Sequence, residues 1–195
     1  KFEIIAVNDR SQDRTSEILH NLQKTTPNLN VINIESNEQK EGMIGKAGAL
    51  QIGIENSKGE IILITDADCT VTPKWISTMV QCYKDSNVGF VSSFTNVTGN
   101  RLFDRIQSIE WIYMHTMAFG GIGNNQPLGC YGNNISIRRD AFDYVGGYRK
   151  IPFSVTEDLA LQQAIHKTKY KVHYLVHPDA LVNTKPCDTF AEYIL

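Results

Sequence analysis

Two carboxylates, Asp66 and Asp68, follow closely on a run of four apolar residues at positions 61–64, with Thr65 between the run and Asp66. The run is bounded by Gly59 and Pro73, which predicts a buried strand. The last side chains of such a strand face the crevice in which α/β proteins bind ligands. Two carboxylates so close together repel each other unless a cation lies between them, and Mg²⁺ or Mn²⁺ prefers oxygen ligands. The segment therefore predicts a divalent metal site, and a solvated acidic turn is the alternative.

Three further polar clusters could carry chemistry. Residues 8–13 also follow a predicted strand, and their Asp9 could accept hydrogen bonds from a ligand or cap the next helix. Lys46 opens a predicted helix, where the macrodipole disfavours a cation, so a nearby phosphate would remove the mismatch. An ordinary exposed lysine is the alternative. Asp158 lies in the first turn of a later helix, where a carboxylate is also favourable for structural reasons. A catalytic role requires Asp158 to reach the crevice.

The elements that must position these residues alternate in the first half of the chain. Predicted strands cover residues 3–7, 31–34, 61–65 and 88–94. Helical segments lie between them, and this βαβαβαβ order predicts the α/β class, with a mostly parallel sheet and helices on both faces. Right-handed crossovers would then place Asp9 and Asp66 along one edge of that sheet.

The second half begins with a long amphipathic helix. Its apolar stripe consists of Leu102, Phe103, Ile106, Ile109, Tyr113 and Met117. Trp111 breaks this stripe, which makes it the best candidate for an exposed aromatic platform, whereas Tyr113 and Phe119 are expected in the core. A loop rich in glycine and asparagine follows, then a strand at 135–137, a helix from about 156 and a strand at 171–176. No linker divides the chain, so we expect one domain over residues 1–195.

The composition excludes several classes of protein. A net charge of −2 gives no support to nucleic-acid binding, which needs a basic surplus. The four cysteines are scattered without a Cys-x-x-Cys pair, which argues against a zinc site or a disulfide framework and fits a reducing compartment. His173 and His177 have no evident third ligand. The chain starts without Met in what looks like a strand, so we expect it to be part of a longer protein, truncated at both ends.

Taken together, five segments resemble the motifs of glycosyltransferase family 2, in the family's order and over essentially the whole chain. Residues 7–15 resemble its Asp-Asp-Gly-Ser-x-Asp-x-Thr segment, 45–51 its Gly-Lys-x-x-Ala-Leu-Asn helix start, 59–68 its Asp-x-Asp strand, 132–139 its acceptor-side segment, and 155–158 its Thr-Glu-Asp motif. The resemblance implies the GT-A fold, a Rossmann-like nucleotide-diphospho-sugar transferase fold. It also implies inverting transfer of a sugar from a nucleoside diphosphate sugar, usually a UDP-sugar, to an acceptor hydroxyl.

The same resemblance assigns roles to individual residues. Asp9 would contact the nucleotide base, Asp66 would face the ribose and diphosphate, and Lys46 would lie on the nucleotide side. Asp68 would bind the divalent metal, Mg²⁺ or Mn²⁺, that bridges the diphosphate. Asp158 would take the proton from the acceptor hydroxyl.

The remaining implied roles concern the acceptor, which is a carbohydrate or lipid-linked molecule in this family. Glu157 would support Asp158, and the acceptor side would be lined by Gly132, Asn133 and Asn134. Similarity to membrane-bound members of polysaccharide biosynthesis implies a domain that faces the cytoplasm, with membrane segments outside this chain.

The chain also departs from the family pattern. Asn8, Arg10 and Gln51 replace the commoner Asp, Gly and Asn, which bears on the preference for the donor. A first strand with a nucleotide-holding turn, usual in the family, is not found before Lys1.

Other functions fit parts of the sequence. Residues 66–71 also fit the Asp-x-Asp-x-Thr-Val motif of haloacid-dehalogenase phosphatases, in which Asp66 would be phosphorylated with Mg²⁺ bound. Two βα units precede this motif, however, and no later strand ends in paired aspartates. A sugar nucleotidyltransferase would need a glycine-rich loop after the first strand. A domain that binds nucleotide without catalysis is the non-enzymatic alternative.

Overall fold

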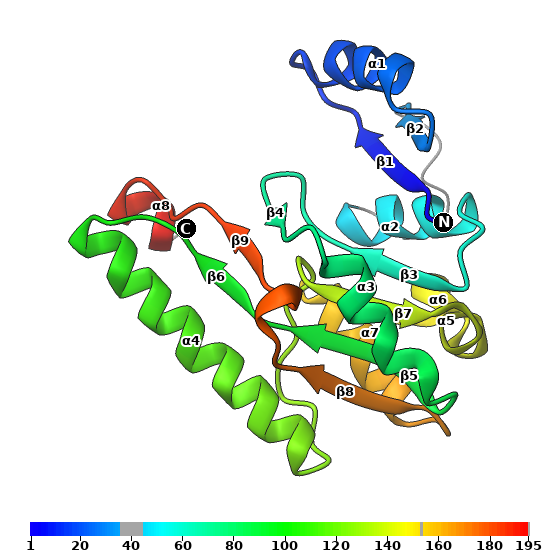
Figure 1. Cartoon of the computed structure of the whole chain (residues 1–195), viewed down its shortest axis with the longest axis vertical. Coiled ribbons are helices and arrows are strands. Elements are labelled where there is room, and N and C mark those ends of the chain that lie inside the picture. The colour runs from blue at the N-terminus through cyan, green and yellow to red at the C-terminus, as the bar shows by residue number, and fades with distance from the viewer. Residues whose placement is uncertain (36–44, 153, 195) are drawn as a thin grey trace.

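The computed structural model describes residues 1–35, 45–152 and 154–194 (Figure 1). Its strands are β1 (Ile4–Asp9), β2 (Leu29–Ile34), β3 (Ile61–Ile64), β4 (Thr70–Val71), β5 (Val88–Ser93), β6 (Thr95–Val97), β7 (Ile135–Arg138), β8 (Lys171–Leu175) and β9 (Val182–Thr184). Its α-helices are α1 (Thr15–Thr25), α2 (Lys46–Glu55), α3 (Trp75–Met79), α4 (Leu102–Gly123), α5 (Arg139–Val145), α6 (Gly147–Lys150), α7 (Glu157–His166) and α8 (Phe190–Ile194). Two 3₁₀ helices cover Val80–Lys84 and Pro178–Ala180.

The described strands form three sheets. The central sheet has the order β3-β7-β5-β8, and smaller sheets have the orders β1-β2 and β4-β9-β6. Strand β7 runs antiparallel to both β3 and β5, whereas β5 pairs with β8 in parallel. The α/β class is as predicted, but the pairing is mixed rather than mostly parallel.

The direction of β7 follows from the path of the chain. Ser92 near the end of β5 is opposite Ile135 at the start of β7. The chain therefore leaves the central sheet at one end, passes through α4, and re-enters at the same end, so β7 has to run in the opposite direction. Sequence patterns reveal strands but not such a return, which is why alternation alone predicts parallel pairing.

The core has two parts, one on each face of the central sheet. Successive side chains of a strand point to opposite faces, and Phe90 and Val91 of β5 accordingly belong to different clusters. Phe90 packs with Phe142 and Leu161 of α5 and α7, whereas Val91 packs with Met79 of α3. Helices thus cover both faces, as predicted (Figure 1).

Helix α4 is oriented opposite to the expectation from its apolar stripe. Leu102, Ile109 and Tyr113 are 77%, 67% and 65% exposed, while the polar Asp104 and His115 on the other side of the helix are buried. The polar face packs inward because its groups find hydrogen-bond partners there, as detailed below.

Trp111 does not form the expected exposed platform. Its ring packs against the rings of His115 and Tyr131, with both centroid distances 5.7 Å. Phe119, expected in the core, is instead about half exposed.

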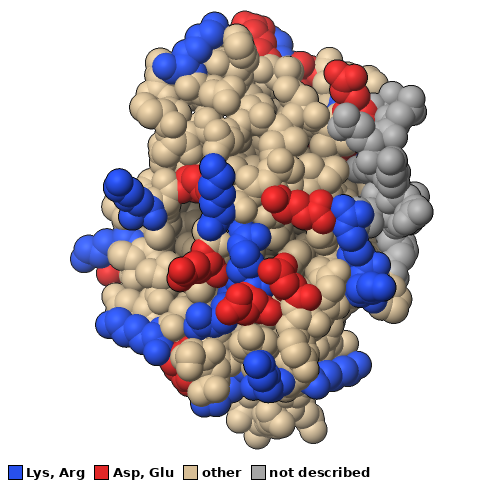
Figure 2. Space-filling view, turned by 90° about the vertical axis from the view of Figure 1, so that its right-hand side faces the viewer, with Lys and Arg blue, Asp and Glu red and all other residues tan. Residues whose placement is uncertain are grey.

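Three further properties of the described residues bear on function. Figure 2 shows Lys and Arg interleaved with Asp and Glu on the right-hand side of the molecule as drawn in Figure 1, with no patch of one sign. Among the described helices, none combines the length and apolar character needed to cross a membrane. The four cysteines are free thiols.

Candidate active site

The first pair in the site joins two motifs that lie 20 positions apart in the sequence. Lys46 is the first residue of α2, and Asp66 follows β3; the Lys46 Nζ lies 2.6 Å from Asp66 Oδ1. Gly45, with a φ of 75°, makes the left-handed turn that starts the helix. Asp66 thus compensates for the cation at the helix start, a position that the macrodipole disfavours. Both side chains stay partly exposed and open to a ligand.

Asp158 is the buried carboxylate of the site. It lies in the first turn of α7, and its Oδ1 accepts a hydrogen bond of 2.8 Å from the backbone N–H of Leu159. Burial raises the pKa of Asp158, and the charge of Glu157 raises it further. The N–H of Leu159, the backbone of Gly132 and the charge of Lys46 act in the opposite direction. The net upward shift in pKa makes Asp158 a stronger base than an exposed aspartate.

Gly132 connects Asp158 with the Lys46 pair. A Cβ at this position would lie 3.3 Å from Asp158 Oδ2 and 3.6 Å from Lys46 Nζ. The residue therefore occupies the space between the base and the cation, where a larger side chain would crowd both. Four separate segments of the chain thus bring Lys46, Asp66, Gly132 and Asp158 together.

Asp68 presents an exposed carboxylate two positions after Asp66, and Cys69 Sγ lies 3.5 Å from its Oδ1. No cluster of three or more His, Cys, Asp or Glu side chains suited to a metal occurs in the described part of the chain. Mg²⁺ is commonly held by one or two carboxylates together with substrate phosphates and water. The donor set therefore fits a metal that arrives with a diphosphate, because Asp68 could supply one hard oxygen ligand.

Asp9 ends β1 and lies in a different sheet from β3, so the predicted shared sheet edge with Asp66 is not formed. The Asp9 carboxylate pairs with the guanidinium of Arg10 through contacts of 2.8 and 3.1 Å. Arg10 has a φ of 57°, a left-handed conformation that suits the Gly more common in the family motif. The preceding Asn8 is buried and donates to Asn33, which ties β1 to β2.

The predicted acceptor-side residues Asn133 and Asn134 are buried and use their side chains within the protein. Asn133 Oδ1 accepts from Thr95 Oγ1 at 2.8 Å, and Asn134 Oδ1 accepts from Trp75 Nε1 at 3.0 Å. Asn134 Nδ2 also donates to the carbonyls of residues 94 and 180. These bonds hold the loop that carries Gly132 in place.

His115 and Gln51 are two supporting residues that the sequence motifs do not assign this role. His115 Nε2 accepts from the Thr95 N–H, so its Nδ1 carries the proton and donates to Tyr174 Oη at 2.7 Å. Burial lowers the pKa of His115 to about 4. Gln51 Oε1 accepts from the Tyr148 N–H at 2.8 Å, which joins α2 to α6. The sequence does contain a signal for the inward position of His115, because His115 shares one face of α4 with the polar residues Asp104 and Gln107.

Comparison with known structures identifies the fold. The fold matches the "Crystal structure of GalNAc-T7 with UDP, GalNAc and Mn2+" with a TM-score of 0.65, over 94% of this chain and 37% of that chain, at 14% identity. The chain therefore has the GT-A glycosyltransferase fold.

The family follows from the sequence. The model of glycosyl transferase family 2 matches residues 1–146, and the chain belongs to this family of enzymes. The β-monoglucosyldiacylglycerol synthase of Trichormus variabilis is 30% identical over 186 residues, which are 91% of this chain and 37% of that protein. The poly-β-1,6-N-acetyl-D-glucosamine synthase of Staphylococcus aureus is 28% identical over 181 residues, which are 89% of this chain and 41% of that protein. The chain thus spans well under half the length of these relatives.

Proposed function

We propose that this chain transfers a sugar, with inversion, from a nucleoside diphosphate sugar to the hydroxyl of a carbohydrate or lipid acceptor. A UDP-sugar is the proposed donor. The observation that carries the proposal is the position of Gly132 between Lys46 and Asp158, with Lys46 paired to Asp66. A partly exposed cation and a buried base therefore lie on either side of one backbone position, which suits a donor phosphate beside an acceptor hydroxyl.

On the donor side, the Lys46 ammonium offers a positive charge to the diphosphate, and Asp66 holds that ammonium in place. Asp9 would accept hydrogen bonds from the nucleotide base. Asp68 would hold a divalent metal, which, when bound, supplies Lewis-acid stabilisation of the charge on the diphosphate. The crystal structure of GalNAc-T7, which shares this fold, was obtained with UDP and Mn²⁺, and this supports the assignment.

On the acceptor side, Asp158 would act as the general base. An acceptor hydroxyl attacks well only as it loses its proton, and a positioned carboxylate contributes about 10²–10⁴ in rate. Burial keeps water away from Asp158 and raises its pKa, which strengthens its affinity for that proton. Glu157 is partly buried and sustains the raised pKa by its neighbouring charge. A single displacement, in which the acceptor oxygen replaces the nucleoside diphosphate at the anomeric carbon, inverts the configuration of that carbon.

The acceptor class rests on the relatives. One relative is named for glucosylation of diacylglycerol and another for a polymer of N-acetylglucosamine. Both products are consistent with an acceptor hydroxyl presented by a lipid or a carbohydrate. A phosphatase with Asp66 as nucleophile is not proposed, because this segment lies within the family-2 match and Asp66 is paired with Lys46.

The test is release of UDP from a panel of UDP-sugars, with diacylglycerol and oligosaccharide acceptors, in the presence of Mn²⁺. Asp158→Asn keeps the size of the side chain but removes the basic site, so we expect turnover to fall by at least about 10² while UDP binding is retained. Glu157→Gln should cost less. Asp140→Asn is a matched control, since Asp140 also lies in the first turn of a helix. Near-native turnover of Asp158→Asn at saturating substrates would show that the base lies elsewhere.

A further inference from the structure

Helix α4 exposes a continuous apolar surface. We call the side chains of Leu102, Ile106, Ile109, Tyr113 and Met117 the outer stripe of α4; each is about half exposed or more. Their spacing of three or four residues puts them on one side of the helix. In a helix that only packs on its own domain, such residues would face the core.

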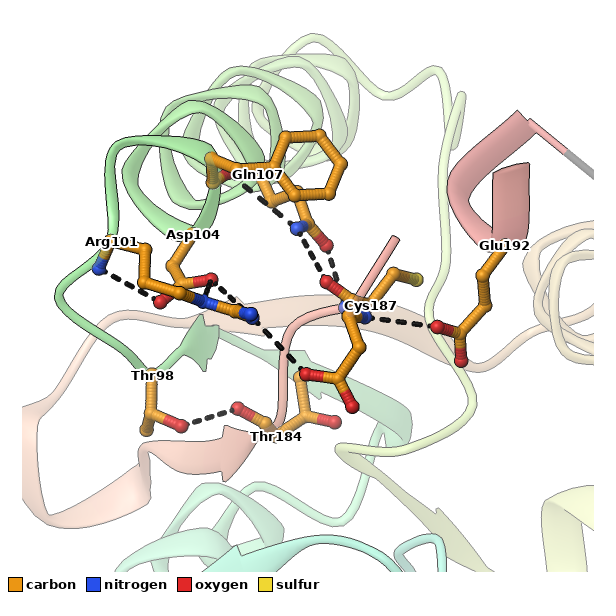
Figure 3. A network of polar contacts seen from close by, with 9 residues as sticks. Thr98, Arg101, Asp104, Gln107, Thr184, Cys187 and Glu192 are labelled. Atoms are coloured by element: carbon orange, nitrogen blue, oxygen red, sulfur yellow. Dashed lines mark hydrogen bonds and ion pairs between the residues drawn. The ribbon is translucent and has the colours of Figure 1, made fainter. Parts of the chain in front are cut away.

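Polar bonds on the opposite side fix this orientation. The Arg101 N–H and guanidinium both donate to Asp104, and Gln107 exchanges two hydrogen bonds with the backbone of Cys187, as Figure 3 shows. His115 bonds Thr95 farther along the same face. Rotating the outer stripe inward would leave these buried groups without partners, so the helix cannot bury the stripe against its own domain.

The apolar surface also extends beyond one ridge of the helix. Ile112 and Phe119 widen it on one side, and Phe190 of α8, which packs near Phe103, widens it on the other. Two paired helices would cover only a narrow seam. A lipid surface, which has no shape of its own to match, covers a broad convex surface of this kind.

The surface leads toward the acceptor side of the proposed site. Exposed Phe119 and Leu128 lie between the outer stripe and Gly132 along the chain. On the inner face of the same helix, Trp111 packs on Tyr131, the residue directly before Gly132. Helix α4 thus packs on the outside of the loop that carries Gly132, and it lies on the left-hand side of Figure 1, away from the face drawn in Figure 2.

We propose that the outer stripe of α4 docks on a lipid bilayer and holds the site at the membrane surface, where a lipid presents its hydroxyl to Asp158. This inference rests on the proposed glycosyl transfer and narrows its acceptor to a membrane lipid. The flanks of the stripe carry one exposed basic residue, Arg105, and one exposed acidic residue, Glu110. Docking is therefore driven by apolar burial rather than by attraction to anionic headgroups, unlike a basic amphipathic helix.

The test is co-sedimentation of the 195-residue chain with vesicles of phosphatidylcholine, alone or mixed with phosphatidylglycerol. The chain should bind both kinds of vesicle, with little dependence on salt. The double variant Ile109→Gln with Tyr113→Gln should lower the partition coefficient at least about tenfold. The matched control is Ile18→Gln with Leu22→Gln on α1, where both residues are also about half exposed. This control should bind within about twofold of the parent chain.

Other outcomes would overturn the proposal. A parent chain that stays in the supernatant, or an α4 variant that binds as well as the parent, contradicts docking through α4. If the chain does not bind vesicles, and sedimentation velocity detects a dimer that the α4 variant no longer forms, the surface is an interface with a second copy. Unchanged thermal unfolding midpoints would show that both double variants fold. Asp158→Asn should bind vesicles as the parent chain does. If the parent chain docks through α4 but releases UDP from none of the donors, the proposed glycosyl transfer is refuted and the docking is not.

Discussion

The ammonium of Lys46 lies 2.6 Å from Asp66 Oδ1, so the cation expected beside a phosphate is held by a carboxylate of the motif that follows β3. A diphosphate at this place would be a second anionic partner for a lysine already oriented for it. Because the ammonium is set before the ligand arrives, little side-chain entropy is left to lose on binding.

Because we propose that Lys46 acts in donor binding, we expect Lys46→Ala in the full-length enzyme to raise the KM for the donor more than it lowers kcat. Steady-state kinetics over a range of UDP-sugar concentrations measure both constants. Lys171→Ala removes another Lys–Asp pair, that with Asp85 at 3.1 Å, and is the control. Loss of kcat with an unchanged KM would contradict the assignment.

The proximity of Lys46 to Asp158 gives a second, independent readout. The charge of Lys46 lowers the pKa of Asp158, so its removal should raise that pKa. Since the base must be deprotonated, the acid limb of the kcat profile should move to higher pH in Lys46→Met. A profile that does not move, or moves to lower pH, would mean that the two groups are not coupled.

Asp68→Ala should abolish the part of UDP affinity that depends on Mn²⁺, because Asp68 is the proposed protein ligand of the metal. Calorimetric titration of UDP with and without Mn²⁺ measures this difference directly. Asp140→Ala, also an exposed carboxylate, should keep the full Mn²⁺ effect. An unchanged metal-dependent affinity in Asp68→Ala would remove Asp68 from the proposed site.

Gly132→Ala should lower kcat while leaving UDP affinity within a few-fold of the parent. The new methyl group would lie 3.3 Å from Asp158 Oδ2, tighter than an ordinary contact, and would fill space beside the base. Gly120→Ala adds a methyl group where nothing lies within 4 Å and serves as the control. Full activity in Gly132→Ala would show that this space is not used by the acceptor.

The buried His115 should make stability depend on pH. Its pKa is lowered from 6.5 to about 4 by burial, so the neutral form is favoured in the folded chain. The resulting stability is present above pH 6.5 and is lost as the pH falls through 6.5 toward 4. Urea unfolding from about pH 7 to about pH 4 should show a smaller decrease for His115→Phe than for the parent. Equal decreases would assign the pH dependence to other groups.

Much of the local structure around the candidate site could be predicted, because it depends on signals that are local in the sequence. The apolar run before Asp66 forms β3, and the Gly45–Lys46 step opens α2, since turn and strand signals act over a few residues. Asp158 lies in the first turn of α7, as its motif predicts.

What could not be predicted depends on long-range partners. The outward orientation of the outer stripe of α4 follows from bonds between Gln107 and Cys187, 80 positions apart, which no periodicity encodes. The separate sheet of Asp9 and the reversed direction of β7 are likewise set by pairing between distant strands.

The ladder between β3 and β7 also links catalysis to the folding process. Ile64 is opposite Ile135, so Asp66 lies two positions beyond this pair in the segment after β3, and Gly132 lies three positions before it in the segment that leads into β7. A slip of one residue would turn every side chain of β7 to the opposite face and misalign Gly132 with both Lys46 and Asp158. Because this ladder closes a loop of about 70 residues, it should form later than the local helices. During refolding, helical signal should therefore return before enzymatic activity, which makes activity a reporter of correct strand register.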